Sequence, residues 1–193
     1  TLVRRAYLDL HGLPPSRKQV EVFLNDRRPD AWPRLIDQLL ESPRYGERWG
    51  RHWLDVAGYA DSEGYNDRDV ERVDAWRYRD YVIASLNADK PWNEFIVEQL
   101  AGDELIKATH YNTSELANAS DDALEKLTAT GFVRLAPDGT YAGSADVELA
   151  KKEVITETIK IVSSSLLGLT VGCAECHHHR FDPIPQEDFY RMR

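Results

Sequence analysis

The residues best suited to chemistry in this 193-residue chain lie together near its end, in the run Cys173-Ala174-Glu175-Cys176-His177. The run holds both cysteines of the chain. Two thiols at this spacing can add across the two vinyl groups of one porphyrin, and the histidine that follows then lies under the iron as its proximal ligand. The pattern C-x-x-C-H is typical of c-type haem attachment. It predicts one covalent haem c (iron) bound by Cys173, Cys176 and His177.

Other uses of the same side chains are weaker interpretations. A structural zinc site would add His177, His178 or His179, but its four ligands usually come as two pairs, and the sequence has no second Cys/His pair. A redox-active dithiol would be expected beside a βαβ unit, which the flanking sequence does not predict. A chance cluster explains the run poorly, because the chain has no other cysteine.

The second axial position of the iron is the open question, and His52 is the preferred distal candidate. A helical pattern that starts at Ser42 and Pro43 places His52 on an apolar, tryptophan-flanked face. A histidine on such a face is also often only a hydrogen-bonded core residue, so both interpretations stay open. Tyr59 and Asp61 follow one to two turns later and could complete a polar distal pocket.

Further residues are weaker candidates for the surroundings of a haem. Met192 would be the sixth ligand of a small cytochrome c, although an incidental core methionine is more common. His179 is too close to His177 to reach the opposite side of the iron, so we expect it to orient a propionate or to hydrogen-bond His177. Arginine binds carboxylates bidentately. The propionate candidates are Arg48, Arg51 and Arg180.

These side chains need a helical framework, and the periodicity of the chain predicts one. The clearest helix runs from about residue 148 to 169 and delivers Cys173, with Ile161, Val162 and Leu166 on the face that we expect to pack into the core beside the porphyrin. Only 132–135 could form a brief strand. The polar stretches 62–74 and 102–120 predict a surface loop or lid and a mobile excursion. We expect a mainly α, helical c-type haem domain with long loops and little or no sheet, a single domain over 1–193.

Composition limits the partners. The formal net charge is −9 and no basic run is present, so nucleic acid and anionic membrane surfaces are poor partners. The most apolar stretch, 161–174, is too short and too interrupted by serines to form a transmembrane segment. The sequence does not open with a signal-peptide pattern. Because haem attachment to C-x-x-C-H normally follows export, we expect a trimmed piece of a longer exported protein.

Longer motifs extend over essentially the whole chain. They are RAYLDL (5–10), GLPP (12–15), SPRYGERW (42–49), RHWLD (51–55), WRYRDYVI (76–83), DKPW (89–92), EQLAGD (98–103) and the run 173–185. Taken together they resemble the family known as domain of unknown function 1549, also called the planctomycete cytochrome-c-associated second domain. The resemblance implies a module of a large exported protein, in the periplasm or at the cell surface. It also implies a neighbouring cytochrome module or another redox protein as partner.

Three functions are compatible with these features. The favoured one is a periplasmic or cell-surface c-type cytochrome domain that carries one covalent haem for electron transfer. The first alternative is a haem enzyme with an open distal site, in which His52 acts as acid or base on peroxide or oxygen, in the service of polysaccharide breakdown. The second is a binding module in which the haem is a structural staple. Electron transfer and catalysis differ in whether the iron keeps an open position.

Overall fold

The structure, a computed structural model, describes residues 2–63, 69–107, 118–141 and 147–193, and these residues are mainly helical. The predicted mainly α fold is confirmed. Within the described ranges the β pairing is limited to one isolated antiparallel bridge, between Ser62 and Glu71. The brief strand predicted over 132–135 is wrong, since this segment belongs to the 3-10 helix η1 (Thr130–Arg134) and the residue that follows it. A short apolar run cannot by itself distinguish a strand from a buried helical turn.

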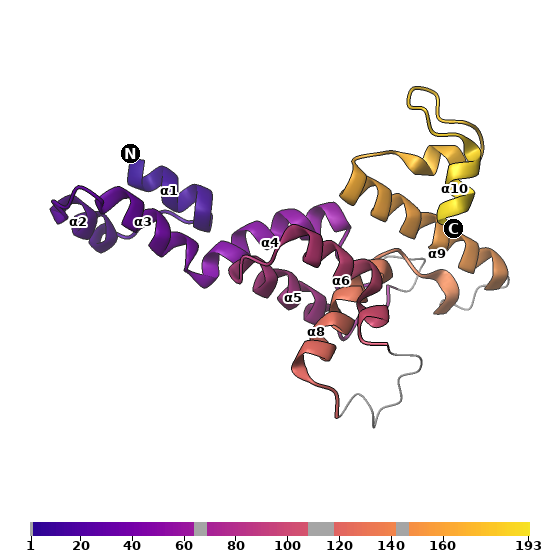
Figure 1. Cartoon of the computed structure of the whole chain (residues 1–193), viewed down its shortest axis with the longest axis horizontal. Coiled ribbons are helices and arrows are strands. Elements are labelled where there is room, and N and C mark those ends of the chain that lie inside the picture. The colour runs from indigo at the N-terminus through magenta and orange to yellow at the C-terminus, as the bar shows by residue number, and fades with distance from the viewer. Residues whose placement is uncertain (1, 64–68, 108–117, 142–146) are drawn as a thin grey trace.

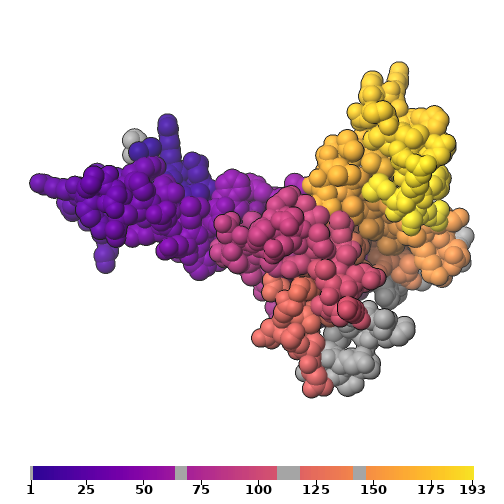
Figure 2. Space-filling view, viewed as in Figure 1, coloured from indigo at the N-terminus to yellow at the C-terminus, as the bar shows by residue number. Residues whose placement is uncertain are grey.

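The helices succeed one another from end to end of an elongated molecule (Figures 1 and 2). The N-terminal end consists of α1 (Leu2–His11), α2 (Arg17–Asn25) and α3 (Ala31–Leu40). The central bundle consists of α4 (Pro43–Ala57), α5 (Ala75–Asn87), α6 (Trp92–Leu105) and α8 (Asp121–Ala129), with η1. The C-terminal end consists of η2 (Gly139–Tyr141), α9 (Val147–Val162), η3 (Ser163–Leu167), η4 (Val171–Glu175) and α10 (Gln186–Met192).

Each of these three parts has its own cluster of buried apolar side chains. The N-terminal cluster gathers around Tyr7 and Leu39, and the central cluster around Trp53, Tyr78 and Phe95. The C-terminal cluster is smaller and consists of Ile159, Val171, Ala174 and Phe189, with Leu169 and Ile184 packed against it. None of the described helices is both long enough and apolar enough to cross a bilayer.

Helix α4 turns a different face to the core from the one predicted. Its buried residues are Gly46, Gly50, Trp53, Leu54 and Ala57, whereas Trp49 and Val56 are 41% and 54% exposed. His52 is also exposed. The physical reason is the pair of glycines, which lets α5 approach so closely that a Cβ on Gly46 would collide with the carbonyl oxygen of Ile83. The placement of His52 on a buried apolar face was therefore wrong.

Helix α9 joins the central bundle to the C-terminal cluster. Ile161, Val162 and Leu166 are partly buried against the central cluster, so the predicted packing of this face into a core is confirmed, and its place beside a porphyrin stays a prediction. Ile159 lies in the C-terminal cluster instead. Beyond Val162 the chain widens into a single π-helical turn, η3, which ends at Gly168 in the left-handed conformation with φ 65°. This helix and its π turn thus carry contacts to both cores.

Candidate functional site

The C-x-x-C-H run forms a tight turn at the surface. Cys173 lies inside the 3-10 helix η4, and Cys176 is the first residue after it. A 3-10 helix has three residues per turn, so side chains three positions apart project on the same side. Both thiols are exposed and neither is in a disulfide. Both free thiols are therefore on the exposed part of this short turn.

The buried side of the turn is held by α9 and α10. Val171 and Ala174 are buried against Ile159 and Phe189. The backbone carbonyl of Glu175 accepts hydrogen bonds from Gln186 Nε2 at 2.8 Å and from the Tyr190 hydroxyl at 3.2 Å. On the other side, the Thr156 hydroxyl donates to Glu175 Oε1 at 3.1 Å. These contacts fix the turn from behind and leave its thiol side open.

Hydrogen bonding sets the tautomer of His177. Its Nδ1 lies 2.8 Å from the carbonyl oxygen of His178. A carbonyl can only accept a hydrogen bond, so Nδ1 must carry the proton and donate it. The lone pair is then on Nε2 of an exposed imidazole. This is the state in which a histidine binds a metal, with the other ring nitrogen held by a carbonyl.

The two histidines that follow have the opposite tautomer. His178 Nδ1 accepts a hydrogen bond from the Gln186 backbone N–H at 2.9 Å. His179 Nδ1 accepts from the Asp182 N–H at 2.8 Å, and its Nε2 donates to the Thr170 hydroxyl at 2.9 Å. Both Nδ1 lone pairs are therefore used within the chain. Of the three consecutive histidines, His177 is the one whose hydrogen bonds leave the lone pair on Nε2.

A mostly apolar hollow of about 450 Å³ opens beside Cys173. It is lined by Lys160, Ser163, Ser164, Leu169, Thr170, Gly172 and Cys173. The stem of Lys160 lies across Gly172, where a Cβ would come within 2.5 Å of Lys160 Cγ. The Lys160 ammonium pairs with Glu157 at 2.7 Å. The hydrogen bond that Lys160 donates to Glu157 is the main cause that raises the pKa of Lys160, and the charge of Glu175 adds to this. The hollow thus has an apolar wall with one cation at its edge.

These features fit a haem better than a zinc ion. A porphyrin would bring four nitrogen ligands of its own and require only one or two from the protein, whereas structural zinc requires four. Across the four described ranges no group of three or more His, Cys, Asp or Glu side chains is arranged to hold a metal ion. Phe181 and Leu167, which lie close to the C-x-x-C-H run in sequence, are exposed apolar side chains that would gain from an apolar cover.

His179 lies at the hollow through its hydrogen bond with Thr170, whereas Tyr59, Arg51 and Arg180 are engaged with other partners. Tyr59 donates a 2.6 Å hydrogen bond to Asp61 and packs against the central cluster. Arg51 pairs with Asp55 on α4. The exposed Arg180 lies over the ring of its neighbour Phe181 at 5.8 Å. The roles of His52, His179, Arg180 and Met192 toward a haem stay predictions.

Sequence reasoning did not single out Lys160 as a site residue. The signal was Gly172, directly before Cys173, since a glycine beside a functional residue often marks a close approach of another chain segment. The absence of a side chain at Gly12 likewise leaves room for Arg48. Its Cδ lies 2.8 Å from where a Cβ on Gly12 would be, at the N-terminal end of the molecule.

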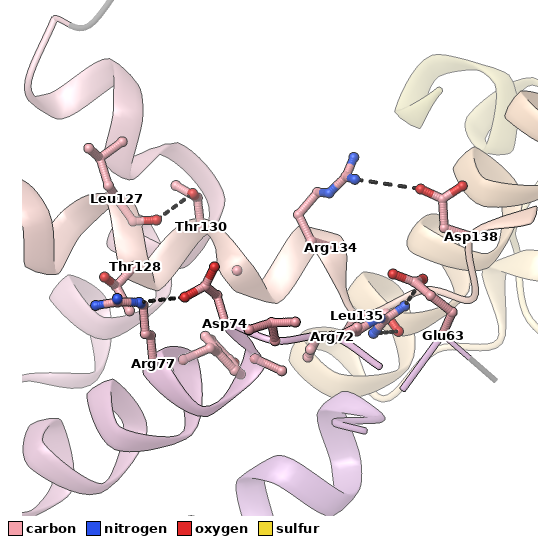
Figure 3. A pocket seen from close by; sticks show the side chains of 14 residues that line it. Glu63, Arg72, Asp74, Arg77, Leu127, Thr128, Thr130, Arg134, Leu135 and Asp138 are labelled. Carbon is pink, nitrogen blue, oxygen red and sulfur yellow. Dashed lines mark hydrogen bonds and ion pairs between the residues drawn. The ribbon is translucent and has the colours of Figure 1, made fainter. Parts of the chain in front are cut away.

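A second cavity, of about 440 Å³, lies between the start of α5 and η1 (Figure 3). Three ion pairs line it, as Figure 3 shows. They are Arg72–Glu63 at 2.8 Å, Arg77–Asp74 at 2.9 Å and Arg134–Asp138 at 3.5 Å. Arg72 also donates to the carbonyl oxygens of Leu135 and Ala136. The charges balance within the cavity wall, and Arg72 links Glu63 to the residues that follow η1.

Fold and site together define a mainly α protein that displays a C-x-x-C-H turn on a small C-terminal core. The chain belongs to the family described as PSCyt2, protein of unknown function (DUF1549), whose model matches residues 1–193. The resemblance stated from the motifs is confirmed. Neither the curated proteins nor the solved structures contain a match to this chain.

Proposed function

We propose that this chain is a c-type haem domain of an exported protein that transfers electrons to a redox partner or a neighbouring cytochrome module. The observation that carries the proposal is the state of the C-x-x-C-H turn. Two free thiols lie on one side of it, and His177 is held by its Nδ1 proton with the Nε2 lone pair facing outward. An exported setting fits this chemistry, because haem attachment to C-x-x-C-H normally follows export.

The residues have distinct parts in holding the group. Cys173 and Cys176 would form the two thioether bonds, and His177 Nε2 would bind the iron. A haem iron supplies a one-electron couple when it is bound. The buried contacts of Val171 and Ala174 keep the turn rigid, which reduces the rearrangement that an electron transfer site would otherwise need.

Lys160 is suited to bind a carboxylate at the edge of the hollow. Its raised pKa keeps the amine protonated near neutral pH, so it acts as a cation and not as an iron ligand. A propionate carboxylate is the natural partner for such a charge at the rim of an apolar site. This assigns to Lys160 the role that the sequence gave to arginines.

A second candidate function has its own support. The hollow is lined by hydroxyls, apolar groups and Lys160, with no imidazole or thioether among the described lining residues. A haem seated there would keep an open sixth position, which is the requirement for chemistry on peroxide or oxygen. His52 is the sequence candidate for a distal acid or base in that case.

The test is intact mass and an absorption spectrum of protein matured in a host with a haem-attachment system. The proposal expects one haem-sized mass increment that survives acid-acetone extraction. His177→Ala should keep the thioether bonds but change the iron spectrum. His178→Ala is the matched control, because the neighbouring ring is engaged by Gln186, and its spectrum should match the parent. An unmodified mass would refute the proposal.

One further measurement separates the two candidate functions. Electron transfer through a six-coordinate iron predicts a low-spin ferric spectrum and no binding of carbon monoxide to the ferrous protein. An open position predicts a high-spin spectrum and rapid carbon monoxide binding. His52→Ala then distinguishes a ligand, whose loss changes spin state, from a distal base, whose loss lowers peroxide reactivity by about 10² to 10⁴.

A further inference from the structure

A row of stacked aromatic side chains crosses the central bundle. Tyr59 stacks on Tyr78 with ring centroids 6.5 Å apart, and Tyr78 stacks on Tyr81 at 6.3 Å. Tyr81 lies parallel to Phe95 at 5.8 Å, and Phe95 stacks on Trp92 at 5.3 Å. Trp92 is 54% exposed. The row therefore runs without a break from the partly buried Tyr59 to the surface.

Two tyrosines of this row have a carboxylate in place to take their proton. The Tyr59 hydroxyl donates to Asp61 Oδ1 at 2.6 Å, and the Tyr81 hydroxyl donates to Glu98 Oε2 at 2.8 Å. A phenol that loses one electron becomes a strong acid, so its oxidation is easy only where a base accepts the proton. Each end of the tyrosine stack meets that condition.

Tyr78, in the middle of the stack, differs from its neighbours. Its hydroxyl bonds Gln99 Oε1 at 2.5 Å and accepts from the Trp53 indole N–H at 2.8 Å. An amide oxygen is too weak a base to keep a phenolic proton. Tyr78 therefore provides ring contact between Tyr59 and Tyr81 and keeps its own proton.

Packing alone does not account for these groups. Phenylalanine would fill the same space, whereas Tyr81 comes with a Glu98 carboxylate that is only 8% exposed. Burying a carboxylate costs free energy even when it is paired, as Glu98 is with Lys90. Buried ionisable groups held at such a cost are concentrated at functional sites.

Both end tyrosines hold their protons at neutral pH. Burial, and then the hydrogen bond to Asp61, raises the pKa of Tyr59 to about 12. Burial and the hydrogen bond to Glu98 raise the pKa of Tyr81 as well. The proton therefore moves only when the ring is oxidised and returns when it is reduced.

The inner end of the row lies close to the Cys173 hollow. A Cβ on Gly58, next to Tyr59, would be 3.9 Å from Ile161 Cδ1. Lys160, Ser163 and Ser164, on the same stretch of α9 and η3, line the hollow. Helix α9 therefore stands between the inner end of the row and the hollow. An α-helix with its side chains is about 10–12 Å across, a distance over which single electrons tunnel readily through protein.

We propose that Tyr59, Tyr78 and Tyr81 relay single electrons between the Cys173 hollow and the surface at Trp92. A strong one-electron oxidant in the hollow takes an electron from Tyr59, whose proton passes to Asp61. Tyr81 then returns an electron to Tyr59 and passes its own proton to Glu98, while the Asp61 proton goes back to Tyr59. An external one-electron donor at Trp92 reduces Tyr81, which recovers its proton. The relay rests on the second candidate function, because an iron centre that reacts with peroxide would supply an oxidant strong enough to take an electron from a tyrosine, whereas the electron-transfer couple of a haem c would not.

The first test needs no haem. The full chain, produced without haem attachment and with Cys176→Ser, is labelled at Cys173 with a ruthenium photosensitiser, which a flash and an electron acceptor convert to a one-electron oxidant. Electron paramagnetic resonance should detect a tyrosyl radical, and spin-trap mapping should find adducts at Trp92. The yield of Trp92 adducts should be independent of protein concentration, because electron transfer within one molecule does not require two molecules to meet.

The decisive variant is Tyr81→Phe, which keeps the ring stack and removes the proton donor to Glu98. Electron transfer between Tyr59 and Trp92 should slow by on the order of 10²-fold, which is the usual effect of removing a positioned proton transfer. The Tyr59 radical should still form. Tyr45→Phe is the control, since Tyr45 lies on the outer part of α4 and contacts Trp49 instead of the row. Circular dichroism checks that each variant is folded. Equal adduct yields at Trp92 in the parent and in Tyr81→Phe would overturn the relay.

The second test uses the haem-loaded protein treated with peroxide and frozen within milliseconds. A tyrosyl radical that Tyr59→Phe abolishes supports the relay in its proposed setting. If the labelled chain relays electrons but no haem is attached on maturation, the relay stands and the proposed function fails. If haem is attached but neither preparation forms a radical on the row, the relay fails and the haem domain stands.

Discussion

Replacing Ile159 by alanine tests whether the C-x-x-C-H turn depends on the C-terminal cluster. Ile159 is 5% exposed and packs with Val171, Ala174 and Phe189. The change removes three carbon groups at about 0.8 kcal/mol each, or roughly 2.4 kcal/mol of transfer free energy. A residual cavity adds to this, so we expect a loss of about 3 kcal/mol, within the usual range for Ile→Ala. For a chain of this size that corresponds to a decrease in melting temperature of roughly 6 to 12 °C.

The assay is urea unfolding followed by circular dichroism, together with the rate at which a disulfide reagent reaches the two thiols. Ile155→Ala is the matched control, because Ile155 lies one turn earlier on the same helix and is 37% exposed. It should cost less than about 1 kcal/mol. If the two variants lose the same stability, the C-terminal cluster does not support the turn and our reasoning about its rigidity is refuted.

Two other predictions follow from contacts near the turn and in the bundle. Gly172→Ala should destabilise the protein by about 1 to 3 kcal/mol in urea unfolding, because the added Cβ would collide with the side chain of Lys160. When Lys160→Ala removes that side chain, the same Gly172→Ala change should cost much less. An equal cost in both backgrounds would contradict the contact. The free energy of unfolding should also fall as the pH rises from 10 toward 12. Burial and the hydrogen bond to Asp61 raise the pKa of Tyr59 in the folded state above its usual 10.0. Over this pH range the unfolded chain therefore loses a proton that the folded chain keeps, which favours unfolding. Unfolding midpoints measured from pH 9 to pH 12 follow this effect, and Tyr59→Phe should give a shallower decline.

The helical framework could be predicted well because it depends on local signals. Ser16, Ser42 and Ser120 each cap a helix with the side chain, and Pro43 follows Ser42 at the first helical position. Such caps satisfy the free N–H groups at a helix start and are visible in the sequence. The C-x-x-C-H chemistry was readable for a similar reason, since five consecutive residues contain it.

The faces that the helices bury were harder to predict because they depend on partners distant in sequence. On α4 the apolar stripe through Trp49 and Val56 faces outward, and α5 packs on the side of Gly46 and Gly50. A prediction from hydrophobicity buries a tryptophan in preference to a glycine. Close approach of two helices, however, requires the glycine at the contact. At the start of η3, Ser163 is fully buried and its hydroxyl donates to the Lys160 carbonyl at 3.2 Å. A serine hydroxyl that is hydrogen-bonded within its own helix can be buried at little cost in free energy.

The π turn Ser163–Leu167 has a consequence for how the site is encoded. A π turn amounts to an α-helix with one additional residue, and each residue of an α-helix advances the chain by about 100° around the axis. The direction in which the chain leaves α9, and with it the side of the molecule that the Cys173 thiol faces, is therefore set by a residue count. Serine-to-alanine changes in this run would preserve that direction. Deletion of a single residue would rotate the C-x-x-C-H turn by about 100° around the axis of α9. The number of residues in this segment therefore determines the direction in which the site faces.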